Sequence, residues 1–156
     1  EEGMNTIITS SQCFTGTDRV YEVSQSIPSD LYINVQGDEP LFNPKDLKLL
    51  IKQSKKYPKK IITGYCEIDN KNLHKDPNIP KVVISPDNRL LYASRAPIPS
   101  NKKKQFVKRW RQVCAYAFPK NVLKIFTSVK KKTELENIED IEYLRFIELG
   151  FEVSTL

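Results

Sequence analysis

Ile33-Asn34-Val35-Gln36-Gly37-Asp38-Glu39-Pro40 is the stretch that decides the fold of this 156-residue chain. A mostly apolar run, residues 31–35, stops at Gly37 and gives way to two carboxylates and a proline. Such a run is typical of a buried strand in an α/β sheet that ends at a site. Gly37 permits close approach of a ligand, and the oxygens of Asp38 suit Mg²⁺. An ordinary turn is the alternative interpretation, because glycine and aspartate are also common in turns.

Strand and helix patterns alternate along the rest of the chain and predict an α/β sheet. A turn at Pro86–Arg89 joins two of the expected strands as a hairpin. The expected strands are Thr6–Thr9, Leu31–Val35, Ile61–Tyr65, Lys81–Ile84, Leu90–Ala93, Gln112–Phe118 and one that starts at Phe151–Val153.

Capping residues predict three helices. Thr17 can cap the first, which Pro28 ends, and Asn43 followed by proline starts the second. A capping box at Thr133 starts the third helix, which runs to Gly150. The buried stripe expected on that last helix consists of Leu135, Ile138, Ile141 and Leu144.

Size and composition are those of a globular protein with one core, so we predict a single domain over residues 1–156. Hydrophobic residues make up 39% and charged residues 28%, and no apolar stretch approaches the length of a membrane span. We therefore expect a cytoplasmic protein without a membrane partner. Three irregularly spaced cysteines indicate reduced thiols and neither a disulfide framework nor a zinc site.

Lysines gather in three runs and give the chain a net charge of +6. The runs lie at Lys52–Lys60, Lys102–Lys108 and Lys130–Lys132, and such runs usually mark solvated surfaces. A basic nucleic-acid-binding domain is an alternative, since Phe106 and Trp110 interleave with basic residues. No recognisable nucleic-acid module accompanies them, which argues against this alternative.

Two further strings carry groups that suit anions. In Thr15-Gly16-Thr17-Asp18-Arg19, small residues at a helix start expose backbone N–H groups, and Arg19 can contact oxyanions. In Ser94-Arg95-Ala96-Pro97-Ile98-Pro99, Arg95 can hold a carboxylate through two parallel hydrogen bonds. Taken singly, the first string is also explained by a capped helix and the second by a surface arginine before a proline corner.

Together with residues 36–40, these strings resemble the signatures of the 3-deoxy-manno-octulosonate cytidylyltransferase (CMP-KDO synthetase) family, and the resemblance covers Asn5 to Phe151. It implies a nucleotide-diphospho-sugar transferase-like (Rossmann-like) α/β fold, with a mixed sheet, helices on both faces and a hairpin region. The family is typically dimeric through that hairpin, here including Val82–Ala93, so a homodimer is expected. The implied reaction transfers CMP from CTP to a 3-deoxy-2-keto sugar acid, KDO or a close relative, and releases pyrophosphate. The product would serve lipopolysaccharide or capsule biosynthesis.

The resemblance also implies a role for individual residues. Asp38 is the expected Mg²⁺ ligand and, with Arg95, a catalytic residue. The implied nucleotide-binding residues are Thr15, Gly16, Thr17, Arg19, Gln36 and Gly37. The implied sugar-acid-binding residues are Gln36, Arg95, Gln112, Tyr116 and Glu142.

The chain departs from the family pattern in two ways. Gln112 stands where the family has a pocket histidine, and Tyr143 stands where it has glutamine, so the particular sugar acid stays open. The family's Arg- and Lys-bearing CTP-phosphate loop and a second metal-binding aspartate have no counterpart here. We expect these segments before Glu1 and beyond Leu156, which makes the chain an incomplete piece of the enzyme. A remnant that binds nucleotide or sugar without catalysis is the alternative.

Overall fold

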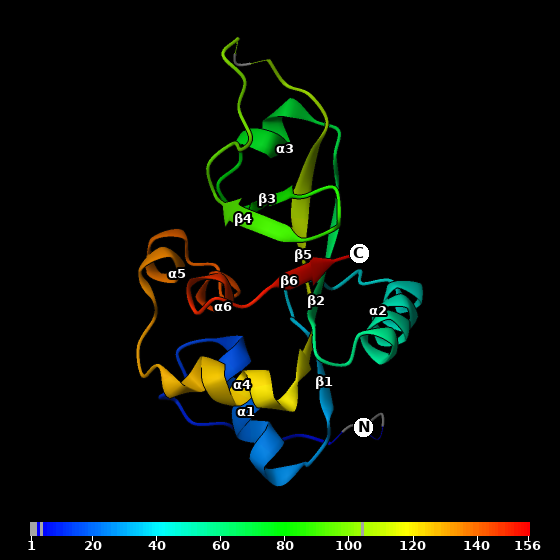
Figure 1. Ribbon diagram of the computed structural model, residues 1–156, viewed down its shortest axis with the longest axis vertical. Helices are drawn as coiled ribbons and strands as arrows, with labels where there is room; N and C mark the ends of the chain where they lie inside the picture. Colours follow the sequence, from blue (N-terminus) through cyan, green and yellow to red (C-terminus); the bar gives the residue numbers. More distant parts are fainter. Residues whose placement is uncertain (1–2, 4, 104) are drawn as a thin grey trace.

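The computed structural model describes residues 3, 5–103 and 105–156, and within this part six strands form one sheet (Figure 1). The strands are β1 (Leu31–Val35), β2 (Ile61–Ile68), β3 (Lys81–Ile84), β4 (Leu90–Ser94), β5 (Arg109–Pro119) and β6 (Val153–Thr155). Across the sheet the order is β4, β3, β5, β2 and β6, and β1 pairs with β5. β2 and β6 run parallel, whereas the other described pairs are antiparallel. The predicted mixed α/β sheet is confirmed.

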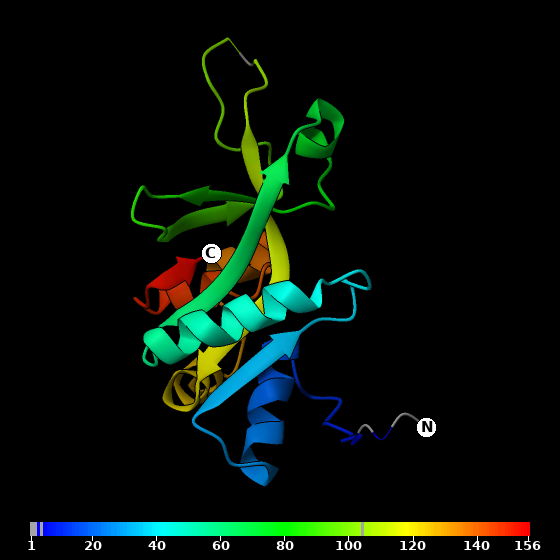
Figure 2. The same cartoon turned by 90° about the vertical axis from the view of Figure 1, so that its right-hand side faces the viewer.

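Helices cover both faces of the sheet, as predicted. The helices are α1 (Gly16–Ser26), α2 (Pro44–Lys56), α3 (Lys71–Lys75), α4 (Lys120–Ser128), α5 (Glu134–Glu139) and α6 (Leu144–Glu148). α2 packs on one face, where buried Leu50 meets Ile62 of β2 (Figure 2). α1, α4, α5 and α6 gather on the opposite side (Figure 1). Phe118 of β5 joins Phe126 of α4 and Phe146 of α6 in the larger core.

The long strand β5 organises the sheet, because two different strands share one of its edges. β3 pairs with Trp110 and Arg111 near the beginning of β5, and β1 pairs with residues 115–119 near its end. Between them, residues 112–114 have no strand partner on that edge in the described sheet. Their backbone instead bonds the loops at the ends of β1 and β3, so the two strands diverge as a fork.

Most predicted strands are confirmed, and three of them extend beyond the predicted ranges. β1 and β3 have the predicted bounds, whereas β2, β4 and β5 are longer. The strand expected at Thr6–Thr9 is wrong, because this segment pairs with no described strand. The last strand begins at Val153, two residues after the predicted start at Phe151. β-branched residues thus form a strand only where the sheet offers them a partner.

The first two helices are present, with one change of cap. α1 is capped by Thr15, whose hydroxyl oxygen accepts from the backbone N–H of Asp18, and the predicted cap Thr17 lies inside the helix. α2 begins as predicted, because the side chain of Asn43 accepts from the N–H of Lys45 and Pro44 occupies the first turn.

The single C-terminal helix predicted from Thr133 to Gly150 is wrong. Asp140 adopts a left-handed conformation with φ of 51°, and the helix breaks there into α5 and α6. Ile138, expected in the buried stripe, is 68% exposed. The backbone carbonyls of Glu139 and Asp140 accept hydrogen bonds from Arg95 instead of from the next helical turn.

Two further findings concern the chain as a whole. No helix in the described residues is long and apolar enough to cross a membrane. Cys13, Cys66 and Cys114 are free thiols. The pKa values of the Cys13 and Cys66 thiols are raised above the ordinary value, mainly because of burial.

Candidate functional site

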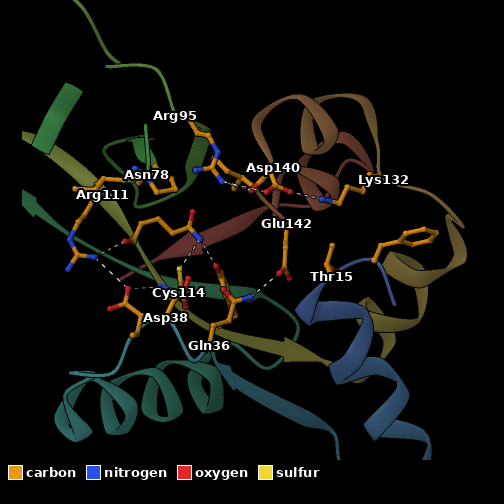
Figure 3. Close-up of a pocket in the computed structure, with 17 residues that line it drawn as sticks. Thr15, Gln36, Asp38, Asn78, Arg95, Arg111, Cys114, Lys132, Asp140 and Glu142 are labelled. Atoms are coloured by element: carbon orange, nitrogen blue, oxygen red, sulfur yellow. Dashed lines mark hydrogen bonds and ion pairs between the residues drawn. The ribbon is translucent and has the colours of Figure 1, made fainter. Parts of the chain in front are cut away.

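A polar cavity of about 510 Å³ opens at the fork between β1 and β3 (Figure 3). Its lining comes mainly from the turn after β1, the loop before β3, β5 and the turn between α5 and α6. A second hollow of about 640 Å³ lies against α1 and β1. Gln36, Asp38 and Glu142 line both, so the two spaces adjoin at these three side chains.

The turn after β1 forms the floor shared by both spaces. Gln36 continues the pairing with β5, since its N–H donates to the carbonyl of Cys114 at 3.0 Å. Gly37 follows, and a Cβ there would meet no atom within 4 Å, so the backbone is open to a ligand. Asp38 is exposed, whereas Glu39 accepts from the N–H of Cys114 at 3.1 Å. The string that decides the fold therefore presents one solvent-facing carboxylate beside open backbone.

Basic and acidic groups alternate around Asp38. Arg111 lies 3.5 Å from the carboxylate of Glu39, in a half-exposed ion pair. Burial first, and then the negative charge of Asp38, raises the pKa of the Cys114 thiol to about 12. The thiol is therefore protonated at neutral pH, and Cys114 is not an activated nucleophile.

The carboxylate of Glu142 occupies the N-terminus of α1. It accepts from the N–H groups of Gly16 and Thr17 at 3.1 and 2.9 Å, and from the Thr17 hydroxyl at 2.6 Å. It also accepts from Nε2 of Gln36 at 2.9 Å. Sequence reasoning expected these N–H groups to face a ligand anion, and in this structure an internal carboxylate occupies them.

Arg19 faces the second hollow. Its guanidinium donates to the Thr9 hydroxyl at 2.6 Å and to the Ser10 carbonyl at 3.0 Å. The segment 6–9, expected as a strand, thus supplies a polar contact that orients Arg19. Thr15, Gly16, Gln36 and Gly37 lie on the same side of the molecule, around the start of α1 and the end of β1.

Arg95 reaches the cavity from the end of β4 and is held by backbone carbonyls. Its Nε donates to the carbonyl of Glu139 at 2.6 Å, Nη1 to that of Pro77 at 3.0 Å and Nη2 to that of Asp140 at 3.1 Å. One N–H on each terminal nitrogen makes no hydrogen bond to a described residue, although Nη2 also lies 3.8 Å from the Asp140 carboxylate in a partly exposed ion pair. The Glu139 carboxylate also accepts a hydrogen bond from the backbone N–H of Arg95 at 2.8 Å.

Gln112 and Tyr116 line the inner wall from β5, next to each other. The amide of Gln112 donates to the Tyr116 hydroxyl, while Oε1 of Gln112 is buried without a hydrogen-bond partner among the described residues. Burial raises the pKa of Tyr116 well above its usual value, so its hydroxyl stays neutral. Tyr143, at the position where the resemblance expects glutamine, is fully buried and does not line the cavity.

The donor set around Asp38 fits a lightly coordinated Mg²⁺. No group of three or more His, Cys, Asp or Glu residues suited to a metal occurs in the described part of the chain. Mg²⁺ keeps several waters and is commonly held by one or two carboxylates together with substrate phosphates. Exposed Asp38 is therefore the residue that would hold it, whereas Glu39 is already engaged by Cys114 and Arg111.

Several cavity residues were missed by sequence reasoning. Lys132 lines the cavity from the run Lys130–Lys132, which was interpreted as a solvated surface, and its Nζ lies 2.5 Å from the carboxylate of Asp140. Arg111 lines the cavity from β5, after the run Lys102–Lys108. Lys81, unlike these residues, does not line the cavity. It is fully buried, and its ammonium donates to the carbonyls of Asp76 and Arg95 at 2.8 and 2.6 Å, so its contacts are structural. Local sequence carries no signal for such contacts, except that an isolated lysine in a strand pattern invites the question of its partner.

Comparison with known proteins defines the class of this chain. The family described as cytidylyltransferase matches residues 1–153, and the chain belongs to that family. Curated relatives named 3-deoxy-manno-octulosonate cytidylyltransferase include one from Acidobacterium capsulatum, 35% identical over 154 residues, and one from Escherichia coli, 30% identical over 153 residues. Each alignment covers 98% of this chain and 62% of the relative, so the chain spans less than two thirds of their length.

Solved structures agree with this assignment. The chain is similar to CMP:2-keto-3-deoxy-manno-octonic acid synthetase complexed with CTP, with a TM-score of 0.89 and 30% identity. That match covers 99% of this chain and 64% of the other. HddC from Yersinia pseudotuberculosis, complexed with GMP-PN, has a TM-score of 0.62 at 14% identity, and this likeness concerns the fold alone.

Proposed function

We propose that this chain acts within an enzyme that transfers CMP from CTP to a 3-deoxy-2-keto sugar acid, KDO or a close relative, and releases pyrophosphate. One observation carries the proposal: a single cavity joins Asp38, at the end of β1, to the Arg95 guanidinium at the break between α5 and α6. A carboxylate suited to a metal–phosphate complex and an arginine with free N–H groups thus face one space. The names of the relatives support this substrate pair.

The nucleotide half of the proposed site lies around α1 and β1. Thr15, Gly16, Arg19, Gln36 and Gly37 line the cavity or the second hollow and would contact the nucleotide, whereas Thr17 is buried, donates to Glu142 and lines neither space. The positive Arg111 and Lys132 would offset phosphate charge across the cavity. Asp38 would hold Mg²⁺, which neutralises phosphate charge when it is bound. These residues fix the α-phosphate in position.

The sugar-acid half lies around Arg95. Its two remaining N–H groups would hold the sugar carboxylate, with Gln112, Tyr116 and Glu142 facing the hydroxyl groups. The anomeric hydroxyl then attacks the α-phosphorus of CTP. A new O–P bond forms, the bond from that phosphorus to pyrophosphate breaks, and the hydroxyl proton is released to water. Catalysis rests on positioning and charge neutralisation and requires no covalent nucleophile, in agreement with the protonated Cys114 thiol.

The remaining expectations belong to this proposal as well. A homodimer would form through the region of the β3–β4 hairpin, and the enzyme would work in the cytoplasm. The product would supply lipopolysaccharide or capsule synthesis, since both use activated sugar acids.

Pyrophosphate release by the complete protein tests the proposal. We expect release from CTP only when a 3-deoxy-2-keto sugar acid and Mg²⁺ are both present. Asp38→Ala should lower kcat by about 100-fold or more, because the metal-holding carboxylate is lost. Asp69→Ala, which removes an exposed carboxylate outside the cavity, is the matched control and should leave kcat unchanged.

Two outcomes would contradict parts of the proposal. Undiminished turnover of the Asp38→Ala variant would show that Asp38 does not hold the metal, and it would not contradict the proposed reaction. CTP binding without pyrophosphate release from any sugar acid offered would contradict the reaction and indicate a nucleotide-binding protein.

A further inference from the structure

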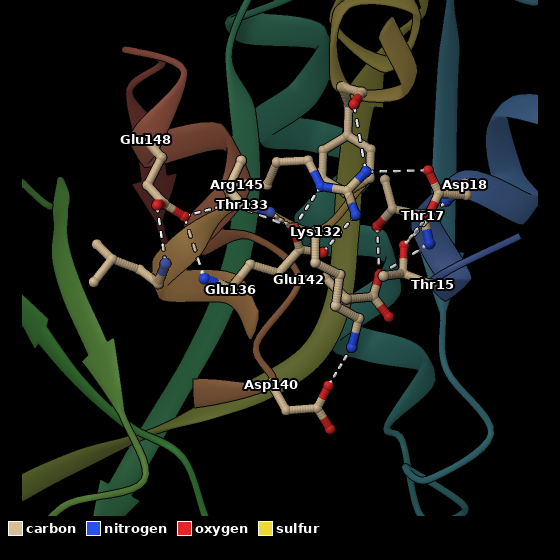
Figure 4. A network of polar contacts seen from close by, with 12 residues as sticks. Thr15, Thr17, Asp18, Lys132, Thr133, Glu136, Asp140, Glu142, Arg145 and Glu148 are labelled. Atoms are coloured by element: carbon tan, nitrogen blue, oxygen red, sulfur yellow. Dashed lines mark hydrogen bonds and ion pairs between the residues drawn. The ribbon is translucent and has the colours of Figure 1, made fainter. Parts of the chain in front are cut away.

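Arg145 of α6 lies at the centre of a buried ionic network outside the cavity (Figure 4). It is 0% exposed, and its Nε and Nη2 both donate at 2.6 Å to the carboxylate of Glu136 in α5. Nη1 donates to Oδ1 of Asp18 in α1 at 3.2 Å. The guanidinium also lies 3.8 Å from the ring centre of Phe126. One side chain thus joins α6 to three other helices, α5, α1 and α4.

The network continues from Asp18 to the cavity. Oδ2 of Asp18 accepts from the Thr15 hydroxyl at 2.8 Å, and the Thr15 oxygen accepts in turn from the Asp18 N–H at 3.3 Å. Thr15 lines the cavity and caps α1. An unbroken series of contacts therefore runs from Glu136 through Arg145 and Asp18 to a residue of the proposed nucleotide site.

Cohesion between helices does not require this arrangement. Burying an arginine with two carboxylates is weak evidence for stability, because apolar residues of similar volume often hold elements together equally well. A bidentate arginine, in contrast, fixes the relative orientation of the groups that it joins. Here the two parallel bonds go to Glu136 and fix Arg145 within the α5–α6 unit, which also carries Glu142. From that fixed position Nη1 contacts the first turn of α1 through its single bond to Asp18.

We propose that Arg145 is a positioning residue that holds the turn Thr15–Thr17 in the orientation required for nucleotide binding, through Asp18. This inference rests on the proposed function, because it takes that turn to be part of the nucleotide site. Arg145 itself does not line either cavity and would touch no substrate.

Asp18→Ala in the complete protein is the decisive variant, because it severs the connection to α1 while the Arg145–Glu136 pair stays in place. We expect its Kd for CTP, measured by titration calorimetry, to rise about tenfold. The KM for the sugar acid should change less than the Kd for CTP, since among the proposed sugar-acid residues Glu142 contacts this turn but Arg95 and Gln112 do not. Asp18→Asn keeps the shape and one acceptor, and its Kd for CTP should lie between those of the wild type and Asp18→Ala. It also serves if the alanine variant does not fold.

Glu148→Gln is the matched control for a purely structural effect. Glu148 contacts the same network from its far side, at Thr133 and the start of α5, away from α1 (Figure 4). It should lower Tm without changing the Kd for CTP. Two results would overturn the inference. One is a Kd for CTP in Asp18→Ala equal to that of the wild type. The other is a change in Kd that parallels the change in Tm in both Asp18→Ala and Glu148→Gln.

Measurements of CTP binding and of product formation by the wild type distinguish a failure of this inference from a failure of the proposed function. CTP binding without product would contradict the reaction, and the Kd comparison between variants would still decide the role of Arg145. A complete protein that does not bind CTP would overturn both, because the turn would then serve no nucleotide.

Discussion

Arg95 shows how a single side chain depends on its shape as well as on its charge. Three backbone carbonyls, from Pro77, Glu139 and Asp140, accept from its Nη1, Nε and Nη2. Lysine has one nitrogen and cannot reproduce this fork. We therefore expect Arg95→Lys in the complete protein to lower kcat/KM for the sugar acid by about 100-fold, with the KM for CTP within about threefold of the wild type. Initial-rate kinetics with each substrate varied in turn measure both values.

Arg89→Lys is the control for this residue-scale prediction. Arg89 is an exposed arginine in the β3–β4 turn and lines neither cavity, so the same chemical change should have no kinetic effect there. If Arg95→Lys retained full activity, the guanidinium would be a structural group and the sugar carboxylate would have to bind elsewhere.

The short helices α5 and α6 depend on one acidic side chain at the scale of the element. Glu148 accepts from the N–H groups of Leu135 and Glu136 at 2.9 and 3.2 Å, and from the Thr133 hydroxyl. Burial alone would raise the pKa of Glu148, but these hydrogen bonds outweigh it and lower that pKa. The ionised form therefore stabilises the fold, and this contribution is present above the unfolded-state pKa. It is lost as the pH falls through the folded-state pKa.

Glu148→Gln should lower the free energy of unfolding by about 1–2 kcal/mol at pH 7, because two helix-starting N–H groups lose a charged acceptor. Urea unfolding at pH 7 and at pH 3 measures this effect. The difference between wild type and variant should be smaller at pH 3 than at pH 7, because protonation of Glu148 removes the charge that the N–H groups bind. An equal difference at both pH values would mean that the carboxylate charge contributes nothing.

Sequence reasoning correctly predicted the ends of helices and strands that depend on local signals. It failed where a residue distant in sequence determines the end of an element. The cap at Asn43 and the end of β1 at Val35, just before Gly37, depend on neighbours in sequence, and both were predicted. The helix break at Asp140 was not, because the Arg95 donors that take the carbonyls there are 44 and 45 residues away. The spacing of the apolar residues between Thr133 and Gly150 is consistent with one continuous helix.

The candidate site follows the same division. The resemblance placed Asp38, Arg95 and Gln112, and the structure brings all three to one cavity. Arg111 was missed, since β5 begins three residues before the predicted strand and only strand pairing aims that side chain at Glu39. The role of Glu142 at the start of α1 was also missed, because it depends on contacts 125 and 126 residues apart.

At the scale of the whole molecule, the fork on β5 predicts an uneven distribution of stability. β5 is paired with β2 on one edge and with β1 or β3 on the other, whereas β1 and β4 each pair on one edge only in the described sheet. Local opening needs less free energy where fewer contacts are broken. In the 156-residue chain, amides of residues 115–118 should therefore exchange with solvent at least about 100-fold more slowly than those of β4.

Native-state hydrogen exchange with residue resolution measures this difference. The amide of Gln36 deserves separate observation, because its bond to the Cys114 carbonyl holds the turn of Gly37 and Asp38 against β5. If that amide exchanges as slowly as the amides of residues 115–118, then Asp38, the carboxylate proposed to hold the metal, is attached to the most stable part of the sheet. If it exchanges as fast as β4, Asp38 lies on a segment that opens locally, and its position would depend on bound ligand. The fork predicts the second result, since Gln36 adds one hydrogen bond to the end of β1, which is paired on one edge only in the described sheet.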